Sequence, residues 1–178
     1  MDQHRRDYLR RRYSRLGWGE WLAASVFAFV AAFSLDGVWG ALESRAAVWW
    51  ALMPLLAVLL QAGAYWLAAR SWVGAGRMPR ALARVFLAVR ALNVGLLVIS
   101  LIGIVATWPG TVLGGLVAIA IWLFAVAEYV NYFVMRIAYR PDRWWRGVRG
   151  RRTPQLMLDV REGVTRARPS PPASPPHD

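Results

Sequence analysis

The sequence predicts an all-α, polytopic membrane protein with four transmembrane helices and both termini in the cytoplasm. Three observations predict this fold. Of the 178 residues, 57% are hydrophobic, which is more than the core of a soluble domain this small can bury. These residues occur in uncharged blocks, and several blocks exceed the roughly 20 residues that a bilayer-spanning helix needs. Positive charge gathers at those ends of the blocks that a four-helix topology places on one side of the membrane.

The first span is expected at residues 18–40. Residues 21–35 are apolar, and a length of about 20 residues is reached only if the span includes Glu20 or Asp36. Tryptophans flank this run on both sides, as they do at membrane interfaces. The basic residues 1–17 precede it as a cytoplasmic segment. Because no small-residue cleavage site follows the run, we expect a membrane span and not a cleaved signal peptide.

The other three spans follow from uncharged stretches and one turn. A stretch with no charge begins at Ala46 and is long enough to cross the bilayer once. Residues 91–127 are also uncharged, but this stretch is too long for one span, and Pro109 and Gly110 predict a turn that divides it. Spans two to four are therefore expected at residues 46–69, 84–108 and 111–138, in a transmembrane domain that covers residues 18–139.

The arginines predict the orientation of the spans. The chain has 22 basic residues, all of them arginine, and a formal net charge of +12. All except Arg45 and Arg90 lie within residues 1–20, within residues 70–84 or from residue 136 onward, and the four-span topology places these three segments on one side of the membrane. Cytoplasmic loops of membrane proteins carry this kind of excess. We therefore expect both termini in the cytoplasm. The use of arginine without lysine suggests a GC-rich coding bias typical of many bacteria, so the expected location is a bacterial inner membrane.

Two further segments are expected after the last span. Residues 140–168 form a basic juxtamembrane segment. Within it, Thr153 as a cap and Pro154 at the first helical position predict a short amphipathic helix, with Leu156, Val160 and Val164 on one face. This helix would rest on the membrane or on a partner protein. Residues 169–178 are rich in proline and serine, a composition typical of a disordered tail.

Arginine and aromatic residues are interspersed both before the first span and after the last. Such segments bind nucleic acid in some proteins, because arginine holds phosphates and aromatic rings stack on bases. Here both segments are tethered to spans, which favours the anionic inner leaflet as the partner and disfavours nucleic acid. The residues expected at the lipid headgroups are Arg10, Arg11, Arg12, Arg143, Trp144, Trp145 and Arg146.

Polar residues inside the spans form the candidate site. Ionisable groups are costly in a bilayer, so each is expected to have a partner or a function. If the 109–110 turn starts an antiparallel hairpin, Arg90 lies level with a position next to Glu128. This register predicts an Arg90–Glu128 ion pair in the inner half of the bilayer. The expected cluster consists of Arg90, Asn93, Glu128, Asn131 and Gln61, with each asparagine three residues from its charged neighbour and hence on the same helix face.

Two interpretations of this cluster remain open. In the structural one, Arg90 neutralises Glu128 and the asparagines bridge the helices. In the functional one, Glu128 exchanges a proton or binds a cationic substrate, as intramembrane carboxylates do in transporters. The predicted arginine partner favours the structural interpretation, because it would hold the carboxylate ionised.

Enzymatic chemistry is disfavoured by the residue content. The chain has no cysteine, and its two histidines, His4 and His177, lie at the termini. Disulfides, thiolate catalysis and most histidine-based metal or acid–base sites are therefore excluded. Neither a G-x-S-x-G nor an H-E-x-x-H motif occurs. We expect no catalytic residue, no metal and no cofactor.

The second half of the chain resembles a group of small bacterial membrane proteins. "VRALN" at residues 89–93 and "AEYVNYFVMRIAY" at residues 127–139 are similar to four-helix integral membrane proteins with an E-Y-[hydrophobic]-N-Y-[aromatic] element in the last span. This resemblance implies no particular activity. In size the chain also resembles the four-helix multidrug transporters, which carry their essential glutamate in the first span, whereas the membrane carboxylate expected here, Glu128, is in the fourth.

The sequence thus predicts a non-enzymatic integral membrane protein of the bacterial inner membrane. The expected role is that of a structural or accessory subunit, working as a homo-oligomer or with a partner membrane protein. One alternative is a small proton- or cation-coupled transporter that uses Glu128. A second is a membrane-tethered binder of nucleic acid or anionic lipid, acting through the arginine-rich tails.

Overall fold

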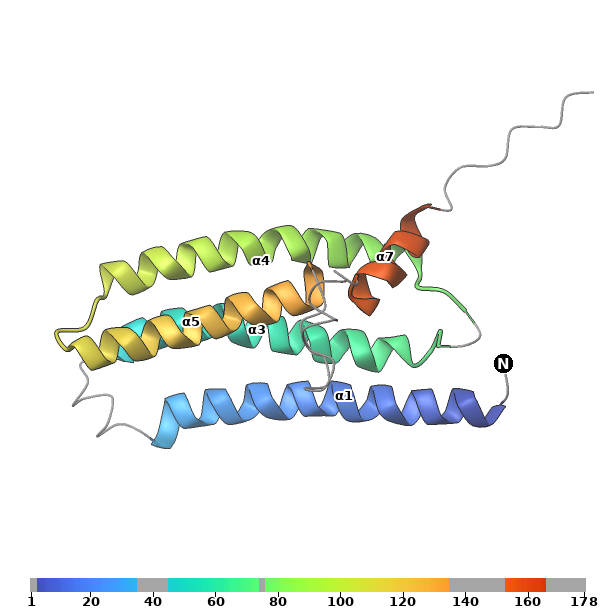
Figure 1. Ribbon diagram of the computed structural model, residues 1–178, viewed down its shortest axis with the longest axis horizontal. Helices are drawn as coiled ribbons and strands as arrows, with labels where there is room; N and C mark the ends of the chain where they lie inside the picture. Colours follow the sequence, from blue (N-terminus) through green and yellow to red (C-terminus); the bar gives the residue numbers. More distant parts are fainter. Residues whose placement is uncertain (1–2, 35–44, 74–75, 135–152, 166–178) are drawn as a thin grey trace, which may run out of the picture.

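The computed structural model describes residues 3–34, 45–73, 76–134 and 153–165, and this part of the chain contains helices and no strands (Figure 1). The elements in chain order are α1 (Gln3–Phe29), the π-helical turn η1 (Val30–Ser34), α3 (Arg45–Ala69), α4 (Arg80–Ala106), α5 (Val112–Phe133) and α7 (Gln155–Thr165). The all-α prediction is confirmed. The predicted basic segment after residue 139 and the tail at 169–178 lie mostly or wholly outside the described residues.

Four helices are long and apolar enough to cross a membrane, as predicted: α1 with η1, α3, α4 and α5. The helices at the second and third spans begin and end within a few residues of the predicted bounds. By contrast, α1 begins at Gln3, so the basic residues before the first span belong to the same helix. Arginine is a good helix former, which explains why the helix extends through them. The predicted ends of spans one and four, residues 35–40 and 135–138, are not described.

Helix α3 is the centre of the bundle, because α1, α4 and α5 all pack against it (Figure 1). In the most apolar stretch of α3, 56% of the residues are buried, compared with 17–22% in the other three spans. The outward faces of those helices carry exposed apolar side chains, such as Leu92 and Ile102 on α4 and Leu116 on α5. A surface of this kind suits the hydrocarbon core of a bilayer.

Helices α1 and α3 cross closely at two glycines. A methyl group added at Gly63 would lie 2.2 Å from Cδ1 of Trp21, and one added at Gly17 would lie 3.0 Å from the Gly63 carbonyl oxygen. Small residues at such crossings let helix backbones approach. The indole N–H of Trp21 donates to the Leu60 carbonyl at 3.1 Å, which adds a polar contact at the same crossing.

Helix α5 starts where the predicted turn ends. Thr111 is its N-cap, and its side chain accepts a hydrogen bond from the Gly114 amide at 3.2 Å. Further along, the indole N–H of Trp122 lies 3.0 Å from the Leu97 carbonyl and 3.1 Å from the Ser100 hydroxyl. These contacts join α5 to α4.

Helix α7 packs on α4 and α5, at the end of the bundle where α1 begins (Figure 1). We call this the arginine-rich end. The apolar face of α7, which we expected on the membrane or on a partner, is covered by this chain's own helices: Leu156, Met157 and Val160 are buried. Val164 is exposed, and Gly163 occupies the buried position on that face.

One carboxylate fixes α7 to the end of α3. Asp159 accepts a hydrogen bond from the Tyr65 hydroxyl at 3.0 Å and another from the Trp72 indole N–H at 2.9 Å. Tyr65 is completely buried, so its hydroxyl depends on this partner. Asp159 therefore sets where α7 docks.

Candidate functional site

The structure brings together two residues of the expected polar cluster, Gln61 of α3 and Asn93 of α4. Gln61 Nε2 donates to Asn93 Oδ1 at 3.2 Å, and Asn93 Nδ2 donates to Gln61 Oε1 at 2.6 Å. Asn93 is buried, and this reciprocal pair satisfies both amides between two spans. It is an interhelical contact of the structural kind.

The expected ion pair between Arg90 and Glu128 is not formed: within the described part of the chain, no ion pair joins these two side chains. The hairpin register predicts depth along the helices, but it says nothing about the direction in which a side chain leaves its helix. Helix α5 packs mainly on α3 and less on α4, and Glu128 lines a cavity together with residues of α1. The side chain of Arg90, on α4, is partly buried.

Glu128 instead shares a pocket with Glu20 of α1. A cavity of about 470 Å³ is lined by residues of α1, α3 and α5, and by the residues 154–156 at the start of α7. Glu20 and Glu128 both line it and are close enough to interact electrostatically. We call this cavity the carboxylate pocket.

Residues at the end of α5 hold the two carboxylates. The Tyr132 hydroxyl donates to Glu20 Oε1 at 2.5 Å, and the Asn131 amide donates to Glu128. Tyr132 is buried, and Asn131 also lines the pocket. Glu128, Asn131 and Tyr132 lie within about one helical turn, which is why a single stretch of α5 reaches both carboxylates.

Aromatic side chains form much of the remaining wall. Tyr13 and Trp66 pack edge to face with their ring centroids 5.0 Å apart, and both line the carboxylate pocket together with Tyr132. The indole N–H of Trp66 is buried and interacts with the side chain of Tyr132. The pocket thus combines negative charge with aromatic side chains.

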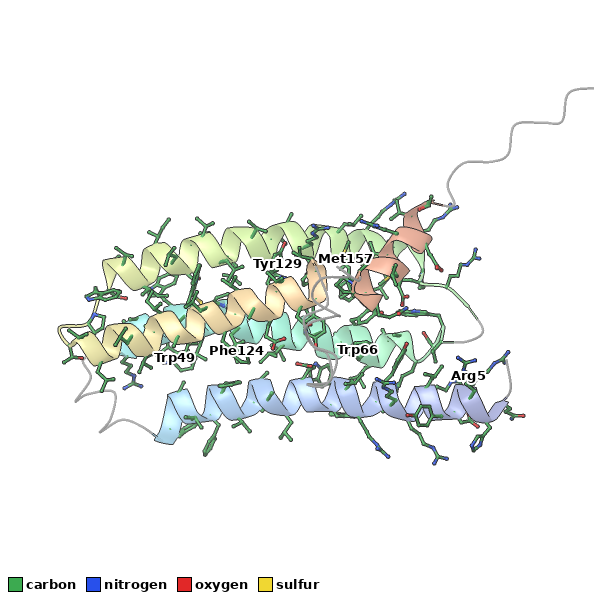
Figure 2. The ribbon with its side chains drawn as sticks, viewed as in Figure 1. Arg5, Trp49, Trp66, Phe124, Tyr129 and Met157 are labelled. Atoms are coloured by element: carbon green, nitrogen blue, oxygen red, sulfur yellow. The ribbon has the colours of Figure 1, made fainter. Side chains whose placement is uncertain are left out.

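The pocket lies in the half of the bundle nearest α7. Figure 2 shows Trp66 of α3 and Tyr129 of α5 in the same region as Met157 of α7, whereas Trp49 and Phe124 lie further toward the opposite end. Arg12 also lines the pocket, so one basic residue of the arginine-rich end borders it. Glu128 therefore lies toward the arginine-rich end of the bundle.

Sequence reasoning missed Glu20, Tyr13 and Trp66 as site residues. The signal for Glu20 was present, because the first apolar run needs this residue or Asp36 to reach the length of a span. No signal in the sequence indicates that α1 and α5, far apart in the chain, meet at this level. Their contact follows from the packing of both helices around α3.

The residues expected at lipid headgroups have separate positions. Arg10, Arg11 and Arg12 are exposed on α1, near the arginine-rich end. Arg12 borders the carboxylate pocket, whereas Arg10 and Arg11 line a different pocket between α1 and the end of α3. Arg143, Trp144, Trp145 and Arg146 lie outside the described residues.

The described residues contain no group of three or more histidine, cysteine, aspartate or glutamate side chains that could hold a metal ion. The carboxylate pocket has only two side chains of these types, Glu20 and Glu128. Its chemistry therefore has to be inferred from these two carboxylates and from the aromatic side chains of its walls.

No protein-family model, curated protein or solved structure matches the chain.

Proposed function

We propose that this protein is a non-enzymatic membrane protein of the bacterial inner membrane that binds a cation in the carboxylate pocket and exchanges it with a proton. One observation carries the proposal: Glu20 and Glu128, from different helices, line the same cavity. Among the described residues neither carboxylate has a basic partner within ion-pairing distance. The arginine-rich end faces the cytoplasm in this proposal, which the distribution of arginines supports.

The chemistry of the pocket suits a cation. Two ionised carboxylates repel each other at close range, and a proton or a bound cation relieves the repulsion. The faces of Tyr13, Trp66 and Tyr132 can attract an organic cation through their ring electrons. The cavity, at about 470 Å³, is within the range of small-molecule sites, which is roughly 300–1,000 Å³.

A structural role of Glu128 requires Arg90 as its partner, because the arginine would hold the carboxylate ionised and neutralised. Among the described residues no ion pair joins the two side chains, which favours a functional role of Glu128. With Glu20 as its charged neighbour, Glu128 can instead release a proton when a cation arrives. Glu20 also supplies a first-span carboxylate, the feature that the four-helix multidrug transporters share.

A second candidate function is the accessory subunit. The exposed apolar faces of α4 and α5, which include Leu92, Ile99, Ile102 and Leu116, offer a surface that lipid or another membrane protein covers. In this case the protein acts as a homo-oligomer or with a partner, and the carboxylate pocket is a polar core between helices.

Binding of tetraphenylphosphonium, a lipophilic aromatic cation, tests the proposal. The purified protein in detergent is titrated by calorimetry. Glu20→Gln and Glu128→Gln are each expected to weaken binding by about tenfold or more, because a contact with a charged group contributes about 1.5–3 kcal/mol. Glu162→Gln, an exposed carboxylate on α7, is the control and leaves the affinity unchanged. If both pocket variants bound tetraphenylphosphonium with wild-type affinity, the proposed cation site would be contradicted and the accessory-subunit function would be favoured.

A further inference from the structure

We infer that a second pocket, between α1 and the end of α3, binds the phosphate group of an anionic phospholipid. This cavity also measures about 470 Å³, and its lining includes three arginines, two serines and an apolar contact: Arg10, Arg11, Arg70, Ser14, Ser71 and Leu67. We call it the arginine pocket. It is separate from the carboxylate pocket, with which it shares no lining residue.

Arg70 is held in place before any ligand arrives. Its Nε donates to the Leu67 carbonyl at 3.1 Å, and its Nη1 donates to the Ser14 hydroxyl at 3.0 Å. Ser14 in turn donates to the Arg10 carbonyl at 3.0 Å, so this chain of bonds links α3 to α1. A guanidinium has more N–H groups than these two bonds use, and the others remain for a ligand. An ordered arginine loses less entropy when it binds.

The charge of the arginine pocket is uncompensated within the described part of the chain. No carboxylate lines the pocket, and none of its three arginines has an ion-pair partner among the described residues. Three guanidinium groups around one cavity repel each other, and an anion relieves that repulsion. Phosphate is the anion that fits best, because a guanidinium can bind two of its oxygens at once.

The position of the pocket indicates that the phosphate belongs to a lipid. Arg70 directly follows Ala69, the last residue of a helix long and apolar enough to span the membrane. Arg70 is therefore expected at the level of the headgroups. Basic pockets between transmembrane helices on the cytoplasmic side are suited to anionic headgroups. Leu67, one turn further into the span, gives the lipid an apolar contact next to its phosphate.

Native mass spectrometry of the full-length protein in detergent tests this inference, with phosphatidylglycerol and phosphatidylcholine as probes. We expect one tightly bound phosphatidylglycerol and no comparable phosphatidylcholine. Arg70→Lys keeps the positive charge but loses the planar guanidinium, which can bind two phosphate oxygens at once. This variant is expected to weaken phosphatidylglycerol binding by about tenfold. Arg10→Gln/Arg11→Gln is expected to weaken it at least as much and leaves the bonds of Arg70 intact, so the test does not depend on one variant folding.

The matched control is Arg5→Gln/Arg15→Gln, which removes the same charge from the same helix outside the pocket. Retained phosphatidylglycerol binding in this control supports a specific site. Equal loss in the control and the pocket variants would overturn the inference, because it would show attraction by net charge alone. Inorganic phosphate at millimolar concentration is the last arm of the experiment. If it displaces the lipid, the site binds soluble phosphate and the assignment to a lipid is overturned; failure to displace it supports the lipid.

Discussion

The Tyr132 hydroxyl on α5 donates a hydrogen bond to the Glu20 carboxylate on α1, with 2.5 Å between the two oxygens. The two residues belong to the first and the last of the four candidate spans. Both helices pack on α3, and this bond joins them directly at the carboxylate pocket. Because Glu128 lies one turn before Tyr132, the bond also determines where Glu20 sits relative to Glu128.

The crossing of α1 and α3 predicts opposite effects for two glycine substitutions. Gly63→Ala places a methyl group 2.2 Å from Trp21, so the helices must separate or the indole must move. We expect a loss of about 1–3 kcal/mol in the free energy of unfolding, as for overpacked cores. Gly19→Ala is the control, since a methyl group there meets nothing within 4 Å. Alanine also favours a helix, so this variant is expected to be neutral or slightly more stable.

Thermal unfolding of the purified proteins in one detergent checks both glycine variants. A Gly63→Ala protein as stable as the Gly19→Ala protein would contradict the close crossing. A change in the tryptophan fluorescence of Gly63→Ala alone would support it, because Trp21 is the residue displaced.

The docking of α7 predicts a cost for removing Asp159. In Asp159→Ala the Tyr65 hydroxyl and the Trp72 indole lose their acceptor, and an unsatisfied buried group costs about 1–3 kcal/mol. We expect a lower unfolding temperature and faster protease cleavage of α7. Glu162→Ala is the matched control on the same helix, because Glu162 and Arg77 are exposed and 3.9 Å apart. Exposed pairs contribute about 0–1 kcal/mol, so little change is expected. Equal effects of the two variants would refute the anchoring role of Asp159.

The Gln61–Asn93 pair predicts coupling between two spans. Gln61→Leu and Asn93→Leu each leave an amide without its partner, whereas the double variant removes both. A double-mutant cycle measured by unfolding is expected to give a coupling of about 0.6 kcal/mol, the average for polar contacts in membranes, and no more than about 1.7 kcal/mol, their maximum. A cycle on Arg90 and Glu128 is the comparison and is expected to give a value near zero. A larger coupling energy for Arg90–Glu128 than for Gln61–Asn93 would contradict the structure and would favour the ion pair that the hairpin register predicts.

The distribution of arginines predicts the orientation of the protein, and the absence of native cysteine makes this easy to test. Gly110→Cys lies in the turn between α4 and α5, and Thr165→Cys lies at the end of α7; both positions are exposed. A membrane-impermeant maleimide is expected to label Gly110→Cys in intact bacteria whose outer membrane has been opened. Thr165→Cys is expected to react only after the inner membrane is permeabilised. The reverse pattern would contradict the positive-inside orientation.

The number of helices long and apolar enough to span a membrane, and the turn between α4 and α5, were predictable from the sequence. Both depend on local features: the length of the apolar runs, the arginines at their ends, and the Pro109–Gly110 turn. The start of α1 was less predictable. Its basic residues look like a separate cytoplasmic segment, but arginine favours helix and no proline interrupts the run.

The site was predictable only in part, because it depends on the direction of side chains around each helix axis. The hairpin register predicts how far Glu128 lies along its helix, and the structure has this residue in the half of the bundle nearest α7. The register also predicts Arg90 as its neighbour. In the structure α5 packs mainly on α3, and the charged neighbour of Glu128 is Glu20. The docking of α7 is a similar case: a short amphipathic helix was predicted, but its apolar face fits a membrane, a partner or its own bundle equally well.

The release of protons on cation binding tests the central claim most directly, namely that Glu20 and Glu128 form one exchange site. Tetraphenylphosphonium is added to the purified protein in weakly buffered detergent solution, with a pH indicator to count the protons released. The account predicts proton release by the wild type and by Glu162→Gln, and none by Glu20→Gln/Glu128→Gln, which also binds the cation weakly. Binding of unchanged affinity without proton release, in the wild type and in the double variant alike, would contradict it.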